Sequence, residues 1–252
     1  KIVHPYNLGF ISDQDLFNHV QETVMKYRFV IDLKKFNKNL VDPIKCTFDA
    51  QVYGKTIAQV VEAEVLRQLD KSNNNHIGYF HQNIFRHIGN GWVVPKEGYD
   101  VENGQRKIFV EMKNKHNTMN SSSSQKTYMR MQHSINKDKD ALCLLVEVIA
   151  TASQNKAWTI SLDKIAISDE RIRRVSMDKF YEMVTGDKFA FKRLCEVLPL
   201  VISDVVSSLK QSEIVQNTVL TELSAIAPDS LLKSIYWLSF QKYQGFDDFH
   251  FR

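Results

Sequence analysis

The chain has 252 residues, 43% hydrophobic and 25% charged, so it is long enough to bury a large core. Nine Gly and five Pro exclude a collagen-like or broadly disordered chain, and no apolar run reaches the roughly 18 residues that a membrane span needs. The net charge of +4 is by itself weak support for a polyanionic partner.

Helical patterns dominate the first third of the chain. Ser12 has the side chain of an N-cap, and the acidic residues that follow it predict a helix over residues 13–29. Apolar residues at helical spacing predict a second helix over residues 55–69, which the polar run at residues 71–75 should end. A short helix over residues 77–88 is expected next, whereas residues 44–53 are ambiguous.

The middle of the chain predicts a β region. Two strands are expected over residues 98–101 and 107–112, joined by a turn. Residues 117–136 begin polar and become helical, with a buried stripe of Tyr128, Met131 and Ile135. Residues 141–150 form the most apolar stretch, which indicates a central strand covered on both faces. Further short strands are expected over residues 158–160 and 165–167.

The last third returns to helical patterns. Helices are expected over residues 177–185, 188–209, 213–226 and 229–243, followed by an aromatic tail that should be buried against the body or a partner. The order of elements indicates an α/β core with helical flanks, formed by a single domain over residues 1–252 whose part from 176 to 252 is helical.

Cysteine usage indicates a compartment. The three Cys cannot all pair, and Cys46, Cys143 and Cys195 each lie in an apolar stretch, which is typical of reduced core thiols. Reduced thiols favour the cytoplasm. The first residues show no apolar stretch of the kind found in signal peptides, so we expect none.

The strand over residues 107–112 and its neighbour bring charged groups together. Period-two alternation places Glu111 and Lys113 on one face, roughly 7 Å apart. Ile108, Val110 and Met112 face the other way. Asp100 precedes the turn and is expected to approach Glu111 from the neighbouring strand.

Two carboxylates and an ammonium that meet at one point are a poor core, because unpaired buried charges destabilise the fold. They are a good Mg²⁺ site, since this ion takes a few carboxylate oxygens and keeps places for water and phosphate. Metal-bound water is a competent nucleophile toward phosphorus. Lys113 would position or deprotonate that water and neutralise charge that develops on the phosphoryl group.

A simpler interpretation remains open for each residue. A Glu-x-Lys pair often lies on a solvated strand face, and an Asp before a turn is common for local hydrogen bonding. The charge distribution favours a binding site in this part of the chain. Between Gly104 and Lys139 there are eight Lys/Arg and two acidic residues, a net charge of +6, so the rest of the chain carries −2. The Asp-x-Lys pattern at Asp32 and Lys34 is a weaker rival, since no turn carboxylate precedes it.

These motifs resemble a known family. Asp100, ten intervening residues and Glu111-Met-Lys113 match the P-D…(D/E)-x-K nuclease signature, with Tyr99 in place of the Pro. The stretches at residues 114–128 and 171–186 are more particular. Together they resemble type II restriction endonucleases of the PD-(D/E)xK superfamily, in the group that recognises GGNCC sites. The resemblance runs from about Tyr6 to the C-terminus.

The resemblance implies a restriction-endonuclease-like core, with a central mixed β-sheet flanked by helices and a helical C-terminal segment. It also implies Mg²⁺-dependent cleavage of double-stranded DNA at a short palindromic site by a homodimer in the bacterial cytoplasm. A cognate DNA methyltransferase is then a genetic rather than a physical partner. Asp100 and Glu111 carry over as metal ligands and Lys113 as the catalytic lysine. The family often adds a carboxylate from an upstream helix, for which Glu64 is preferred over Glu62.

The segment after Lys113 supplies side chains suited to DNA, because Lys and Arg neutralise phosphates, whereas Asn, Gln and Arg pair with base edges. The residues expected to bind DNA are Asn114, Lys115, Asn117, Asn120, Gln125, Lys126 and Arg130. The serine tract at residues 121–124 would donate to phosphates or enclose the duplex as a loop. The basic residues Arg171, Arg173 and Arg174 are expected either to reach DNA or to face solvent.

Three functions compete. The first is a site-specific double-strand endonuclease that leaves 5′-phosphates. The second keeps the nuclease core but assigns it a structure-directed or repair role. The third is a DNA-binding module without catalysis, in which Lys113 would be dispensable.

Overall fold

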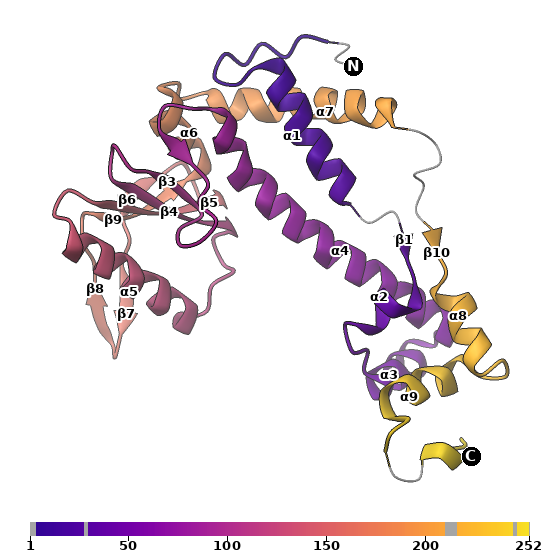
Figure 1. Cartoon of the computed structure of the whole chain (residues 1–252). Helices are drawn as coiled ribbons and strands as arrows, with labels where there is room; N and C mark the ends of the chain where they lie inside the picture. Colours follow the sequence, from indigo (N-terminus) through magenta and orange to yellow (C-terminus); the bar gives the residue numbers. More distant parts are fainter. Residues whose placement is uncertain (1–3, 28–29, 210–215, 244–245, 252) are drawn as a thin grey trace. The chain divides into compact units, whose positions relative to one another are not determined.

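The computed structural model describes residues 4–27, 30–209, 216–243 and 246–251. The chain divides into two compact units (Figure 1). Unit 1 comprises residues 1–24 and 77–208, and unit 2 comprises residues 25–76 and 209–252. The long helix α4 (Ile57–Asn83) contributes residues to both. That the whole chain acts as a single domain stays a prediction.

A six-stranded mixed sheet forms the centre of unit 1. Its order is β2-β3-β4-β5-β9-β6, with β4, β5 and β9 parallel and the other pairs antiparallel. The strands are β2 (Trp92–Val93), β3 (Val101–Asn103), β4 (Ile108–Lys115), β5 (Leu142–Ile149), β6 (Asn155–Ala157) and β9 (Ile172–Ser176). The expected α/β class with a mixed sheet flanked by helices is confirmed.

Strand β5 is the central strand that its apolar sequence predicts. It pairs with β4 on one side and β9 on the other, and Cys143 to Val146 are fully buried. Side chains of alternate residues enter two different cores, since Leu144 and Val146 belong to one hydrophobic cluster and Cys143 and Leu145 to another. Both faces of the sheet are therefore covered, as a parallel centre requires.

Helices cover the two faces of this sheet (Figure 1). One core joins the sheet to α1 (Asp13–Lys26), the 3-10 helix η1 (Ile84–His87), α6 (Met177–Thr185) and α7 (Ala190–Ser208). The other core packs the sheet against α5 (Ser121–Lys137) and the hairpin of β7 (Ile160–Leu162) and β8 (Ile165–Ile167). The predicted stripe of Tyr128, Met131 and Ile135 is buried there, which confirms the helical pattern of α5.

Unit 2 is mainly helical. Its elements are β1 (Val30–Ile31), α2 (Leu33–Asn37), α3 (Pro43–Tyr53), the first part of α4, β10 (Gln216–Asn217), α8 (Val219–Ile226), α9 (Leu231–Phe240) and η3 (Phe246–Asp248). Strand β1 pairs in parallel with β10. Ile31, Phe36, Val61, Val65 and Leu223 lie in one buried cluster, so this unit has a hydrophobic core of its own.

Several helices differ from their predicted bounds. The polar run at residues 71–75 does not end the preceding helix, because α4 continues to Asn83. Within this run the Asn74 amide donates to Asp70 and Ser72 pairs with His76, one turn apart, so polar side chains support the helix locally. Residues 44–53 are helical, capped at the N-terminus by Asp42. The first helix ends at Lys26, and residues 28–29 lie outside the described residues.

The C-terminal third is close to its prediction. Helix α6 spans the expected residues and ends at Gly186, whose φ of +77° is the left-handed conformation that glycine adopts easily. The expected helix from 213 to 226 begins at Val219, and residues 210–215 lie outside the described part. In the aromatic tail, Phe249 stacks on Tyr236 with ring centroids 5.5 Å apart.

Two sequence interpretations need correction. Cys46 and Cys143 are buried thiols as expected, but Cys195 is exposed, so it is not part of the core. The Asp-x-Lys pattern at Asp32 was expected on a possible strand, but in the described part of this stretch the strand β1 ends at Ile31, and Asp32 instead caps α2 by accepting from Lys35 N. Among the described residues, no helix is long and apolar enough to cross a membrane.

Glu147 provides a test of the sheet. Its carboxylate is 1% exposed and is bound by both Nε and Nη2 of Arg174, at 2.7 and 2.8 Å. Removal of one member of a buried ion pair leaves the other charge uncompensated, so we expect Glu147→Gln to lower the free energy of unfolding by about 3 kcal/mol in urea denaturation.

The control is Glu170→Gln, which removes the partner of Arg173. Glu170 is 85% exposed, so its loss should cost less than about 1 kcal/mol. Equal effects of the two substitutions would contradict this account of the sheet.

Candidate active site

Buried apolar side chains and partly exposed side chains alternate along the first six residues of β4, as predicted. Ile108, Val110 and Met112 are buried in the core on the α6 side of the sheet. Glu111 and Lys113 point to the opposite face, where α5 lies. The burial of three apolar side chains thus fixes the direction of both charged ones.

Asp100 is fastened to β4 beside these residues. Its backbone N–H donates to Val110 O at 2.9 Å, and its carboxylate Oδ2 accepts from Met112 N at 2.8 Å. Burial raises the pKa of Asp100 above the usual range, and the neighbouring Glu111 carboxylate raises it further, against the opposing effects of the Met112 N–H and of Lys113. The structure therefore brings Asp100, Glu111 and Lys113 together.

Glu111 is held between two cations. Its side chain is 13% exposed, and its Oε1 lies 3.4 Å from the Lys113 ammonium. Its Oε2 accepts from the Arg130 guanidinium, which α5 supplies. Two carboxylates and two cations thus form one nearly neutral cluster, which explains how these charges share a half-buried position.

Tyr99 has a structural role where the motif name has Pro. The Arg130 guanidinium lies over the Tyr99 ring, 4.6 Å from its centroid. The Tyr99 hydroxyl is hydrogen-bonded to Ser134 Oγ of α5 at 2.8 Å. Tyr99 therefore joins the segment before β3, which carries Asp100, to the helix that carries Arg130.

The donor set fits a hard divalent cation. Asp100, just before β3, and Glu111 of β4 offer carboxylate oxygens beside one another, and Mg²⁺ is usually held by one or two carboxylates together with water and substrate phosphate. No group of three His, Cys, Asp or Glu side chains placed to hold a metal occurs among the described residues. Glu111 already attracts two cations, as expected for a cation ligand.

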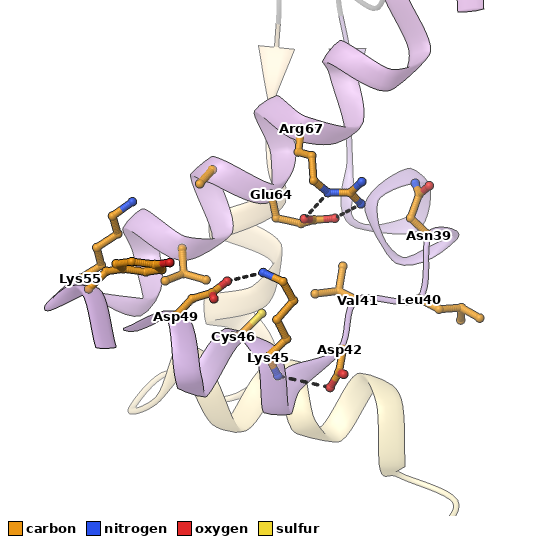
Figure 2. A pocket seen from close by; sticks show the side chains of 13 residues that line it. Asn39, Leu40, Val41, Asp42, Lys45, Cys46, Asp49, Lys55, Glu64 and Arg67 are labelled. Carbon is orange, nitrogen blue, oxygen red and sulfur yellow. Dashed lines mark hydrogen bonds and ion pairs between the residues drawn. The ribbon is translucent and has the colours of Figure 1, made fainter. Parts of the chain in front are cut away.

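Glu64, the expected additional carboxylate, lies in unit 2 (Figure 2). Arg67 donates to both of its oxygens, at 2.7 and 2.8 Å, and Gln68 Nε2 donates to Oε1 at 3.0 Å. Burial raises the pKa of Glu64, but these hydrogen bonds outweigh burial and hold the pKa below its usual range. Glu62 is exposed. A catalytic role for Glu64 stays a prediction.

The serine tract is not a loop, which corrects one expectation. Residues 121–124 form the first turn of α5, because Asn120 caps the helix by accepting from Ser123 N at 2.8 Å. Lys126 and Arg130 are four residues apart on this helix and therefore lie on one side of it.

The remaining residues expected to bind DNA differ in solvent exposure and in their contacts within the protein. Lys115, Asn117 and Lys126 are exposed, and Asn114 is half-buried in β4. Gln125 is engaged within the protein, since its amide donates to Ser161 O at 2.9 Å. Their roles toward DNA stay predictions.

The basic residues Arg171, Arg173 and Arg174 all make hydrogen bonds within unit 1. Arg171 donates to Lys139 O at 2.7 Å and Arg173 to the Asn155 side chain. Arg174 binds Glu147, and its Nη2 also donates to His116 O at 3.1 Å. These contacts support a structural role for the three arginines.

Glu147 is a residue near the site that sequence reasoning did not assign. It pairs in register with Lys113 across the parallel strands β4 and β5, so the two side chains share a face. The signal was available, because Glu147 is the one charged residue in the apolar stretch of residues 141–150.

Known proteins are similar to this chain over most of its length. The family model described as Eco47II restriction endonuclease matches residues 8–207. The type II restriction enzyme Sau96I of Staphylococcus aureus is 34% identical over 214 residues, which cover 80% of this chain and 82% of that protein. The type II restriction enzyme Eco47II of Escherichia coli is 30% identical over 213 residues, which cover 79% of this chain and 88% of that protein. The resemblance to type II restriction endonucleases is confirmed.

The raised pKa of Asp100 gives a prediction about stability. Burial disfavours its charged form, so an ionised Asp100 destabilises the fold above its pKa in the folded protein and has no such effect below about pH 3.9. We expect Asp100→Asn to be at least as stable as the wild type at pH 7, with an advantage that shrinks as the pH falls toward 4. Urea denaturation across this range measures the difference.

Asp163→Asn is the matched control, because Asp163 is exposed in the turn between β7 and β8. Its stability difference from the wild type should stay within about 0.5 kcal/mol, as is usual for an exposed side chain. A large loss of stability in Asp100→Asn at pH 7 would show that the Asp100 charge stabilises the fold.

Proposed function

The chain belongs to the Eco47II restriction endonuclease family, and we propose that it cleaves double-stranded DNA at a short palindromic, GGNCC-like site with Mg²⁺. The family consists of hydrolases that act on DNA, so the proposal concerns the site, the metal and the products. The cluster of Asp100, just before β3, with Glu111 and Lys113 of β4 supports it most directly.

Asp100, Glu111 and Lys113 would have different roles in phosphodiester hydrolysis. Asp100 and Glu111 would hold Mg²⁺, which when bound activates water and polarises the phosphate. Water attacks phosphorus, the bond from phosphorus to the 3′ oxygen breaks, and the products are a 5′-phosphate and a 3′-hydroxyl. Lys113 would orient or deprotonate the attacking water and neutralise charge that develops on the phosphoryl oxygens.

Arg130 would serve the phosphate as well. In the protein alone its guanidinium binds Glu111 and is supported by the Tyr99 ring. A guanidinium is suited to phosphate because it presents several donors in a fixed plane. Lys126 lies one turn before Arg130, so α5 offers two cations to the DNA backbone on the same side as the cluster.

Site recognition requires further elements. The GGNCC-like specificity rests on the resemblance of residues 114–128 and 171–186. A palindromic site is matched by a two-fold homodimer, because each subunit then cuts one strand. A host with the same sites needs protection, so a cognate DNA methyltransferase would be a genetic partner.

The products of digestion test the proposal as a whole. We expect a plasmid incubated with the protein and Mg²⁺ to give discrete fragments, and sequencing of their ends to show one recurring site with a fixed stagger. Chelation of the metal should stop cleavage. Ragged degradation or nicking at DNA junctions would instead favour a structure-directed nuclease.

Substitution of the cluster tests the assignment of residues. We expect Lys113→Ala and Asp100→Ala each to lower the cleavage rate by about 10³-fold or more, because each removes a group that acts on the reacting phosphate. DNA binding, measured by a mobility shift with Ca²⁺ in place of Mg²⁺, should be largely kept.

Lys139→Ala is the control, since Lys139 is exposed and precedes the start of β5, at the other end of the strands. It should cut at the wild-type rate. If Lys113→Ala also cuts at that rate, the cluster is not the active site.

A further inference from the structure

Helix α3 in unit 2 exposes a stripe of large apolar side chains. Ile44, Phe48 and Val52 are 51, 65 and 69% exposed. They follow one another at intervals of four residues, so they lie along one side of the helix. The opposite side is buried through Pro43, Cys46 and Ala50, which means that the core of unit 2 does not use this stripe. A contiguous apolar surface of this kind marks an interaction site.

Two further exposed apolar residues lie near the stripe. Leu40 precedes α3, and Tyr53 is its last residue, four positions after Asp49 and therefore not in line with Ile44, Phe48 and Val52. Leu40 is 83% exposed and Tyr53 is 70% exposed, and both line a pocket of about 490 Å³ beside the helix (Figure 2). Leu40 also has a φ of +50°, a left-handed conformation that is costly for a branched residue.

The charges beside the stripe are self-complementary. Lys45 and Asp49 follow Ile44 and Phe48 by one position each, and they form an ion pair along one flank of the helix (Figure 2). From the N-terminus this flank is first positive and then negative. An antiparallel copy of α3 runs in the reverse order, so it would set Lys45 against Asp49 of the partner. A parallel copy would set like charges together.

We infer that this α3 surface, comprising Leu40, Ile44, Phe48 and Val52, binds a second copy of the chain through an antiparallel, two-fold pairing of α3. The inference rests on the proposed function in one respect, since a palindromic DNA site calls for a two-fold dimer. It adds the surface and the register that such a dimer would use.

The register follows from the spacing of the stripe. With Phe48 against Phe48 of the partner at the two-fold axis, Ile44 packs on Val52 of the partner at both ends. Apolar side chains then meet apolar ones along the whole helix, and the two Lys45–Asp49 contacts lie beside them. Leu40 of one copy approaches the Tyr53 end of the other. Phe48, a large aromatic at the centre, would contribute most of the affinity.

The first experiment measures the oligomeric state of the full chain by analytical ultracentrifugation. We expect the wild type to be a dimer and Phe48→Glu to weaken self-association by 100-fold or more, because two charges would be buried at the axis. Circular dichroism should be unchanged, since Phe48 packs on little within its own chain. Val52→Lys is a second variant with the same expected outcome.

Phe189→Glu is the matched control. Phe189 is 54% exposed in unit 1, so the same substitution there should leave the dimer intact. A wild-type chain that is monomeric at all concentrations, or a Phe48→Glu chain that remains dimeric, would overturn the inference.

The second experiment tests the antiparallel register by charge reversal. Lys45→Glu sets a carboxylate against Asp49 of the partner, and Asp49→Lys sets an ammonium against Lys45 of the partner. Each variant alone should therefore dimerise at least 10-fold more weakly than the wild type. An equal mixture of the two variants should restore dimers, because both contacts of the mixed dimer then join opposite charges. Within each chain the pair remains broken, so recovery cannot come from the helix itself. Absence of recovery on mixing overturns the register.

The outcomes separate this inference from the proposed function. Dimers that persist in Phe48→Glu and still cut DNA would show that the surface is wrong and the activity correct. Loss of DNA binding in a Phe48→Glu chain that remains dimeric would mean that the stripe contacts DNA. A wild-type dimer that Phe48→Glu dissociates but that never cuts DNA would contradict the proposed function alone.

Discussion

The pairing of β3 with β4 is the constraint on which the candidate site depends. Asp100 is joined to β4 by its backbone at Val110 and by its carboxylate at Met112, the two residues that flank Glu111. The same two residues lie in the core, so their burial directs Glu111 to the opposite face. A slip of one residue would place Glu111 in the core and expose Met112. Hydrophobic packing on one face of β4 therefore specifies the position of the charged side chains on the other face. Attraction between the charges alone would not fix that position.

The balance of charge in the cluster suits the proposed reaction. Without DNA, Arg130 and Lys113 neutralise Glu111, and the Tyr99 ring supports Arg130. In the proposed reaction a DNA phosphate would compete with Glu111 for Arg130, and a divalent cation would compete with Arg130 for Glu111. Each exchange frees the partner that the other needs, so phosphate and cation would favour one another's binding. In the protein without ligands, the Arg130–Glu111 ion pair therefore occupies the groups that the phosphate and the cation would each bind.

The sequence predicted those features that depend on local pattern. The alternation of β4, the buried stripe of α5 and the end of α6 at Gly186 all follow from periodicity or from a single residue type. The continuation of α4 through residues 71–75 was missed, because packing in both units holds the helix where the composition favours a turn. The contact of Arg130 with Glu111 joins residues 19 positions apart, which no spacing rule anticipates. Sequence therefore indicated the three motif residues but not the ion pair of Arg130 with Glu111.

Glu147 shows how the site and the segment after it are joined. Across β4 and β5 it is the register partner of Lys113, and its own partner Arg174 binds the backbone carbonyl of His116, the residue that follows β4. The His116 N–H in turn donates to Ile149 O at 2.9 Å. These contacts fix the point at which the chain leaves the sheet toward the residues proposed to bind DNA. A buried ion pair adds little net stability compared with apolar packing, so its location is better explained by this positional role. Hydrogen bonds thus join the strand that carries Lys113 to the start of the segment proposed to bind DNA, so the position of that segment is set by the same sheet that positions Lys113.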